Sequence, residues 1–179
     1  MKKIFIDVGY HIGRAVSIFK ETKEYSSDFI IYAFEPRIDL EKAQQKTKEE
    51  NIAFLKTAAW IYDGEIKFYI SSRNKGQPSG IFDTFRGKNK ESFMSPCIDF
   101  SKWIIDNFNK DDFIVLKMDI EGTEQDVLNK MIEDGSINYI DIAYVEWHNK
   151  KREGYKEFKT ALKNISSLDL RTAIEWYKE

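Results

Sequence analysis

Short apolar runs alternate along the chain with segments in which apolar residues recur every three or four positions. Unbroken apolar runs bounded by glycine, proline or charge are typical of buried strands, whereas the wider spacing is typical of helices. The pattern predicts strands at Lys3–Val8, Phe29–Phe34, Ile52–Ala59, Phe113–Met118, Tyr139–Trp147 and Leu170–Trp176. It predicts helices at Ile12–Tyr25, Asp39–Glu50, Asp99–Phe108, Thr123–Asp134 and Tyr155–Ile165.

This alternation of strands and helices is typical of one class of fold. Parallel strands need a crossover connection, so the pattern predicts an α/β protein whose mostly parallel central sheet has helices on both faces. The length of 179 residues predicts a single domain over residues 1–179, because domains usually hold roughly 100–200 residues. Asp63-Gly64 predicts a hairpin turn ahead of an alternating strand at Glu65–Ile70.

One long segment, Ser71–Pro96, departs from both patterns. It contains three glycines and two prolines and shows no apolar period. Its basic residues exceed its acidic residues by three. Loops of this length are usually functional or mobile. The segment is therefore predicted to be a long loop, which is either simply solvated or acts as a lid over a substrate.

Composition and charge exclude several classes of protein. The single cysteine, Cys97, excludes an intrachain disulfide framework and a cysteine-rich zinc cluster, and it fits a reducing, cytoplasmic location. The longest unbroken apolar run has six residues, at Phe29–Phe34, which predicts that no segment spans a membrane. The net charge of −2 argues against a general nucleic-acid binder, since such domains are normally basic.

Candidate chemistry follows the predicted strands directly, because ligands of open α/β sheets bind outside the carboxyl ends of the strands. After the first strand, Gly9 and Gly13 lie four residues apart, which is not the dinucleotide fingerprint. Glu35 follows the second strand, where a carboxylate can accept hydrogen bonds from both hydroxyls of a ribose. His11 lies between the two glycines, where contact with a ligand and simple solvation are equally good explanations.

The later strand ends carry small, aromatic and ionisable residues. Ala58 and Ala59 precede Trp60, and small residues beside an aromatic ring suit stacking on the flat base of a ligand. A core position explains Trp60 equally well. The next two ends are rich in charge, at Lys117–Glu124 and Glu146–His148.

Some of these charges also have structural explanations. Lys117 points to the face opposite its neighbour Met118 and would pair there with a carboxylate. Glu121 and Glu124 lie at the start of a predicted helix, where negative charge is stabilised. We assign a functional role to Glu121 and only the structural role to Glu124.

Taken in order, these segments resemble the FkbM-like methyltransferases, a class I S-adenosylmethionine-dependent family. The resemblance rests on Asp7–Gly13, Tyr32–Pro36, the Ala58-Ala59 and Asp63-Gly64 region, Leu116–Glu124 and Glu146–His148. Leu116–Glu124 is the most specific segment, because it is close to the family's Lys-Ile-Asp-Val-Glu-Gly-x-Glu. Tyr10 and His11 depart from the family, which usually has a small residue and an asparagine there.

The resemblance implies a Rossmann-like class I methyltransferase fold, here with a shortened C-terminal end. It implies methyl transfer from S-adenosylmethionine to a hydroxyl of a sugar, glycan or related small molecule. The residues expected to bind the cofactor are Asp7, Gly9, Tyr10, His11, Gly13, Glu35, Pro36, Ala58, Ala59 and Asp119. The residues expected to act in catalysis are His148, Asp119, Glu121 and Lys117. His148 is the expected base, since an unperturbed imidazole titrates near neutral pH, and Asp119 would orient the acceptor, hold the imidazole or ligate a metal.

Several alternatives stay open at this stage. Asp119, Glu121 and His148 are compatible with a divalent cation such as Mg²⁺, although no spacing demands one. Another domain or a second copy of the chain could complete the acceptor site. An RNA ribose 2′-O-methyltransferase shares the expected fold, but the net charge disfavours it. A catalytically inactive, methyltransferase-like binding protein is favoured by the departures at Tyr10 and His11.

Overall fold

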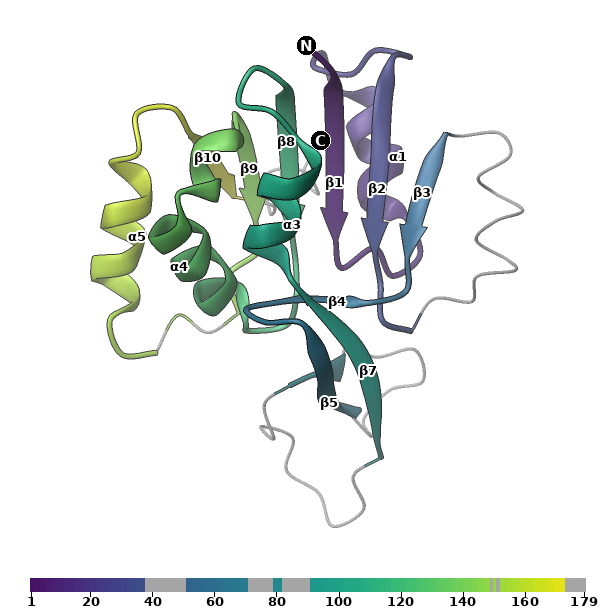
Figure 1. Cartoon of the computed structure of the whole chain (residues 1–179), viewed down its shortest axis with the longest axis vertical. Coiled ribbons are helices and arrows are strands. Elements are labelled where there is room, and N and C mark those ends of the chain that lie inside the picture. Colours follow the sequence, from purple (N-terminus) through teal and green to yellow (C-terminus); the bar gives the residue numbers. More distant parts are fainter. Residues whose placement is uncertain (38–50, 71–78, 82–90, 149, 151, 173–179) are drawn as a thin grey trace.

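A parallel six-stranded sheet forms the centre of the protein (Figure 1). The computed structural model describes residues 1–37, 51–70, 79–81, 91–148, 150 and 152–172. The strands lie in the order β10-β9-β8-β1-β2-β3, and all their pairings are parallel. Their bounds are β1 (Lys3–Val8), β2 (Phe29–Phe34), β3 (Ile52–Leu55), β8 (Phe113–Met118), β9 (Ile142–Val145) and β10 (Asp169–Thr172). The parallel sheet predicted from the apolar runs is confirmed.

Helices cover both faces of this sheet, as the alternating pattern predicted. One face packs against α1 (Arg14–Glu21), where the rings of Phe5 and Phe19 stack with centroids 4.1 Å apart. The other face packs against α3 (Phe100–Asn107), α4 (Glu124–Asp134) and α5 (Tyr155–Lys163) (Figure 1). The side chains of Ile4, Phe5 and Ile6 in β1 alternate between these two cores, which is why this part of the strand is apolar without a break. The predicted helix at residues 39–50 lies outside the described residues.

A second, four-stranded sheet lies at the carboxyl end of the central strands (Figure 1). Its order is β4-β7-β5-β6, with bounds β4 (Ala58–Trp60), β5 (Gly64–Ile70), β6 (Ser79–Gly80) and β7 (Ser92–Asp99). The single strand predicted at Ile52–Ala59 is therefore wrong, because it divides between the two sheets. The break falls at Lys56, which is exposed.

The predicted hairpin at Asp63-Gly64 is also wrong. β4 and β5 do not pair with each other, because β7 lies between them, parallel to β4 and antiparallel to β5. The end of the predicted loop, from Ser92 to Pro96, belongs to β7. The sequence of this strand shows no apolar period, because its polar Ser95 is buried (1% exposed) and its apolar Met94 is exposed (55%). Polar residues usually lie outside and apolar ones inside. Residues 71–78 and 82–90 of the predicted loop lie outside the described residues.

The C-terminal part of the central sheet differs from prediction only in its limits. The strand predicted at Tyr139–Trp147 is shorter, since a 3-10 helix at Ser136–Tyr139 precedes β9. β10 begins at Asp169, and residues 173–176 of the predicted last strand are not described.

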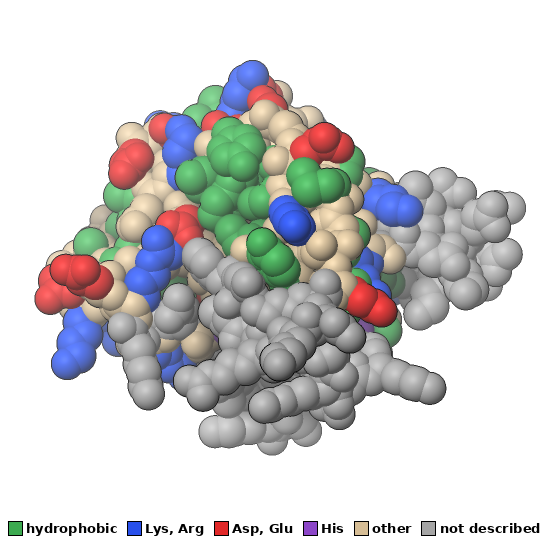
Figure 2. Space-filling model, turned by 90° about the horizontal axis from the view of Figure 1, so that it is seen from below, with side chains coloured by type: hydrophobic (Ala, Val, Ile, Leu, Met, Phe, Trp, Pro, Cys, Tyr) green, Lys and Arg blue, Asp and Glu red, His purple; other side chains and the backbone are tan. Residues whose placement is uncertain are grey.

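Within the described ranges, no helix has the length and apolar character that crossing a membrane requires. Seen from the side of the small sheet, hydrophobic side chains gather in one area bordered by charged ones (Figure 2).

The close approach of two strand ends gives the first testable prediction. Gly9 has φ +89°, and a Cβ there would lie 1.9 Å from the backbone oxygen of Asp119. Gly154 has a similar φ of +72°, but a Cβ there would meet nothing within 4 Å. Gly154→Ala should therefore cost only backbone strain, about 1–2 kcal/mol. Gly9→Ala should cost a further 1–3 kcal/mol or so from the steric conflict.

Chemical denaturation of both variants measures these costs. Equal losses of unfolding free energy for Gly9→Ala and Gly154→Ala would contradict the close packing of the two strand ends.

Candidate active site

A cavity of about 510 Å³ lies between the carboxyl ends of the central strands and the small sheet. Among the residues expected to act in the site, those that line it are Gly9, His11, Glu35, Pro36, Ala58, Ala59, Asp119 and Glu121. The small sheet adds an apolar wall, which includes Trp60, Ile66 and Phe68. The cavity thus has charged groups on the side of the central sheet and an apolar surface opposite them.

The loop after β1 is shaped by three residues with positive φ. These are Gly9 at +89°, His11 at +50° and Gly13 at +82°. Tyr10 does not line the cavity; it is buried, its ring meets Phe54 edge-on at 4.9 Å, and a Cβ on Gly13 would collide with it. Tyr10 and Gly13 therefore set the shape of the loop, and neither lines the cavity. The expected contact of either residue with the cofactor stays a prediction.

Glu35 fastens this loop to the end of β2. Its Oε2 accepts a hydrogen bond from the backbone N–H of His11 at 3.0 Å, and its Oε1 accepts one from Arg37 N–H at 2.9 Å. A carboxylate has about four acceptor sites, so both oxygens can accept further bonds. Glu35 can therefore hold the loop and a ligand at the same time.

A buried ion pair lies beneath the cavity floor. Asp7 and Lys117 are register partners on β1 and β8, and Lys117 Nζ lies 3.1 Å from Asp7 Oδ1. Lys117 also donates to the carbonyl oxygen of Gly9 at 2.8 Å and lies 3.7 Å from Asp119 Oδ2. Complete burial raises the pKa of Asp7 to about 6, against the opposing effect of the Lys117 ammonium.

This pair bears on two of the expected roles. The pairing of Lys117 with a carboxylate is confirmed. Neither Asp7 nor Lys117 lines the cavity, and the Asp7 side chain is 0% exposed. In this geometry both residues support the site from below. The expected contact of Asp7 with the cofactor and the expected catalytic role of Lys117 stay predictions.

The turn after β8 is held by a residue to which sequence reasoning gave only a structural role. Glu124 is the first residue of α4, and its side chain is 2% exposed. Its Oε1 accepts hydrogen bonds from the backbone N–H of Ile120 at 3.2 Å and of Gly122 at 3.0 Å. Between these two, Glu121 has a left-handed backbone with φ +57°. Such a conformation is costly for a residue other than glycine and persists where its surroundings enforce it.

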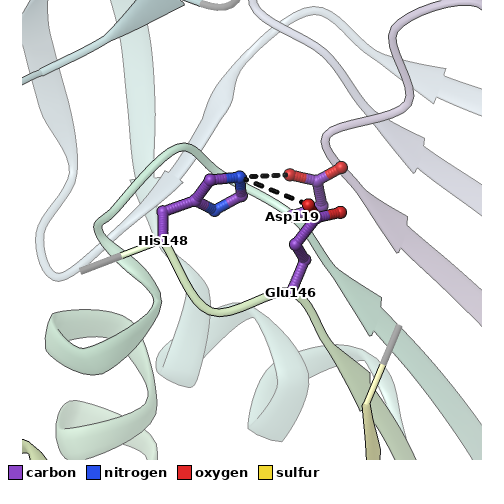
Figure 3. Close-up of side chains that lie close together, drawn as sticks. All are labelled: Asp119, Glu146 and His148. Atoms are coloured by element: carbon purple, nitrogen blue, oxygen red, sulfur yellow. Dashed lines mark ion pairs between the residues drawn. The ribbon is translucent and has the colours of Figure 1, made fainter. Parts of the chain in front are cut away.

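His148 follows β9 and points toward the turn after β8 (Figure 3). Its Nδ1 lies 2.9 Å from Glu124 Oε1. Its Nε2 lies 3.6 Å from Asp119 Oδ1 and 3.7 Å from carboxylate oxygens of Glu121 and Glu146. The predicted adjacency of the two strands that position Asp119 and His148 is confirmed.

The charges around His148 alter its expected chemistry. Burial alone would lower its pKa, but the hydrogen bond with Glu124 and the charges of Glu124, Glu121 and Asp119 raise the pKa of His148 to about 9. Burial in turn raises the pKa of Glu121 and of Glu146. These charges favour the imidazolium form of His148 at neutral pH. The role of base, which was expected from the unperturbed pKa of an imidazole, stays a prediction.

Three of these side chains form a set that could hold a metal ion. Ligand atoms of Asp119, Glu146 and His148 all lie within 4.8 Å of one another (Figure 3). Two carboxylates and an imidazole suit a hard or borderline divalent cation. Glu146 was not among the expected site residues, although its place two residues before His148 on a predicted strand end could have indicated it.

Comparison with known proteins gives one result. The family described as the methyltransferase FkbM domain matches residues 7–171. No curated protein and no solved structure matches the chain. The matched range includes the residues of the candidate site, from the Asp7–Lys117 pair to His148.

The buried ion pair gives the second testable prediction. Lys117→Met should destabilise the protein by about 3–5 kcal/mol, because it leaves the Asp7 carboxylate buried without its partner. Combining Lys117→Met with Asp7→Asn should recover much of this loss, since no unpaired charge then remains. Denaturant unfolding of the single and double variants measures both values. If the double variant is no more stable than Lys117→Met alone, the pair is not what holds this part of the sheet.

Proposed function

This chain belongs to the FkbM methyltransferase family, and on this premise we propose that it is an S-adenosylmethionine-dependent O-methyltransferase. The proposed acceptor is a hydroxyl of a sugar, glycan or related small molecule. One observation carries the proposal: Glu35 and Asp119 line the same cavity from the strands on either side of β1. A ligand held at one carboxylate would therefore extend across the end of β1 toward the other.

The first half of the cavity suits the cofactor. When bound, S-adenosylmethionine supplies a methyl group on a positively charged sulfur, which is already a strong electrophile. Gly9 exposes its backbone to a close approach, and Glu35 would accept hydrogen bonds from the ribose hydroxyls. Ala58 and Ala59 are small, and with Trp60 they offer an apolar surface for the base. The protein then has mainly to align the acceptor oxygen with the methyl group.

The second half suits the acceptor. An alcohol is a poor nucleophile near neutral pH, so a nearby base should take its proton as the new bond forms. Asp119 lines the cavity and is the better base, because its neighbour His148 is held in the protonated form. The His148 imidazolium, with Nε2 3.6 Å from Asp119 Oδ1, would orient that carboxylate. This assignment exchanges the two roles first expected from the sequence.

A divalent cation fits the same residues. Asp119, Glu146 and His148 would hold it, with His148 then neutral. Such an ion would lower the pKa of a hydroxyl bound to it, which would help the acceptor to lose its proton.

Loss of the ribose contact gives the third testable prediction. Glu35→Ala should weaken the affinity for S-adenosylmethionine about 10- to 100-fold, because charged hydrogen bonds worth roughly 1.5–3 kcal/mol disappear. Isothermal titration calorimetry measures the dissociation constant. Glu65→Ala is the control, since Glu65 is an exposed carboxylate on the small sheet. An unchanged dissociation constant for Glu35→Ala would reject the assignment, and no binding to the unaltered protein would reject the whole proposal.

The base gives the fourth testable prediction. Asp119→Asn should lower kcat by about 10²–10⁴, the usual effect of removing a positioned base. His148→Ala should lower kcat by less, since it removes the group that orients the base. His148→Ala should bind S-adenosylmethionine nearly as well as the unaltered protein.

Methyl transfer to a panel of sugars, detected by mass spectrometry, measures these rates. Asp106→Asn, an exposed carboxylate on α3, is the matched control and should keep full activity. A larger loss in His148→Ala than in Asp119→Asn would return the role of base to His148. Full activity in both would place the reaction elsewhere.

A further inference from the structure

Glu124 binds three groups through one buried oxygen. Its Oε1 lies 3.2 Å from Ile120 N, 3.0 Å from Gly122 N and 2.9 Å from His148 Nδ1. Two of these partners are backbone N–H groups of the turn that follows β8, so the oxygen has a fixed position. The third partner comes from the end of the neighbouring strand, β9. Glu124 therefore joins the two segments that carry the charged groups of the site.

This contact determines which ring nitrogen of His148 carries the hydrogen and which one faces the carboxylates of the site. An ionised carboxylate can only accept hydrogen bonds, so the hydrogen in the contact belongs to Nδ1 of the ring. Nε2 is then the nitrogen that faces Asp119, Glu121 and Glu146, at 3.6–3.7 Å. Which ring nitrogen of a histidine keeps its proton is generally set by the hydrogen bond that the other side of the ring makes.

We propose that Glu124 is a positioning residue that fixes the tautomer of His148. It keeps the hydrogen on Nδ1, so that Nε2 is the nitrogen that faces the carboxylates and is available to a cation. A buried carboxylate behind a histidine plays this orienting part in many metal and catalytic sites. Only the expected effect on turnover rests on the proposed function; the tautomer itself does not.

Nitrogen-15 NMR of the full chain tests the tautomer directly. The chain has only two histidines, and His11 is exposed, so it serves as an internal reference. Above pH 9, where the neutral ring of His148 is populated, we expect a protonated Nδ1 on His148 and the ordinary protonated Nε2 on His11. Glu124→Ala should return His148 to the Nε2-protonated form. Glu124→Gln keeps an oxygen that can accept from the same groups, so it should keep Nδ1 protonated.

Asp126→Ala is the matched control. Asp126 lies in the same first turn of α4, but it pairs with Arg152 instead of His148. It should leave the tautomer unchanged. In turnover, Glu124→Ala should lower kcat about 10²-fold through misplacement of the ring, and Glu124→Gln should restore most of it.

Two results would overturn the inference. One is a protonated Nε2 on neutral His148 in the unaltered protein, a measurement that holds even if Glu124→Ala fails to fold. The other is an unchanged tautomer in folded Glu124→Ala. Absence of methyl transfer with the expected tautomers would count against the proposed function alone.

Discussion

The site depends on one buried ammonium group, that of Lys117. It bridges the register partners β1 and β8 at their carboxyl ends through Asp7 and the carbonyl oxygen of Gly9. Burying both charges carries a desolvation penalty, which short contacts and several hydrogen-bonding partners are needed to offset. The same ammonium lies 3.7 Å from Asp119, so the loop after β1 and the proposed base share one anchor. The floor of the cavity is therefore fixed before any ligand arrives.

Negative charge predominates above this floor. Asp119, Glu121, Glu124 and Glu146 surround the single imidazole of His148. Carboxylates held this close together favour a cationic ligand, because like charges in a partly buried site are unfavourable unless a positive charge is added. A sulfonium and a divalent cation both meet that requirement. One cause, the group of neighbouring carboxylates, thus raises the pKa of His148 and suits both the proposed cationic cofactor and a metal ion.

The sequence predicted the central sheet well and the small sheet poorly, for physical reasons. Strands buried on both faces leave unbroken apolar runs, and β8 and β9 were correctly expected to be neighbours. β7 left no such signal, because Ser95 is buried and Met94 is exposed. Glu124 was assigned only to the helix end, since nothing local indicates that its carboxylate reaches a residue 24 positions away. The altered charge state of His148 likewise arises only where three segments meet.

A crystal structure of the protein with S-adenosylhomocysteine would test this account most directly. In such a structure the ribose hydroxyls should contact Glu35, and the sulfur should lie on the side of the cavity formed by Asp119. An acceptor hydroxyl would then fit between that sulfur and the Asp119 carboxylate. A product bound away from Glu35, or with its sulfur directed away from Asp119, would contradict it.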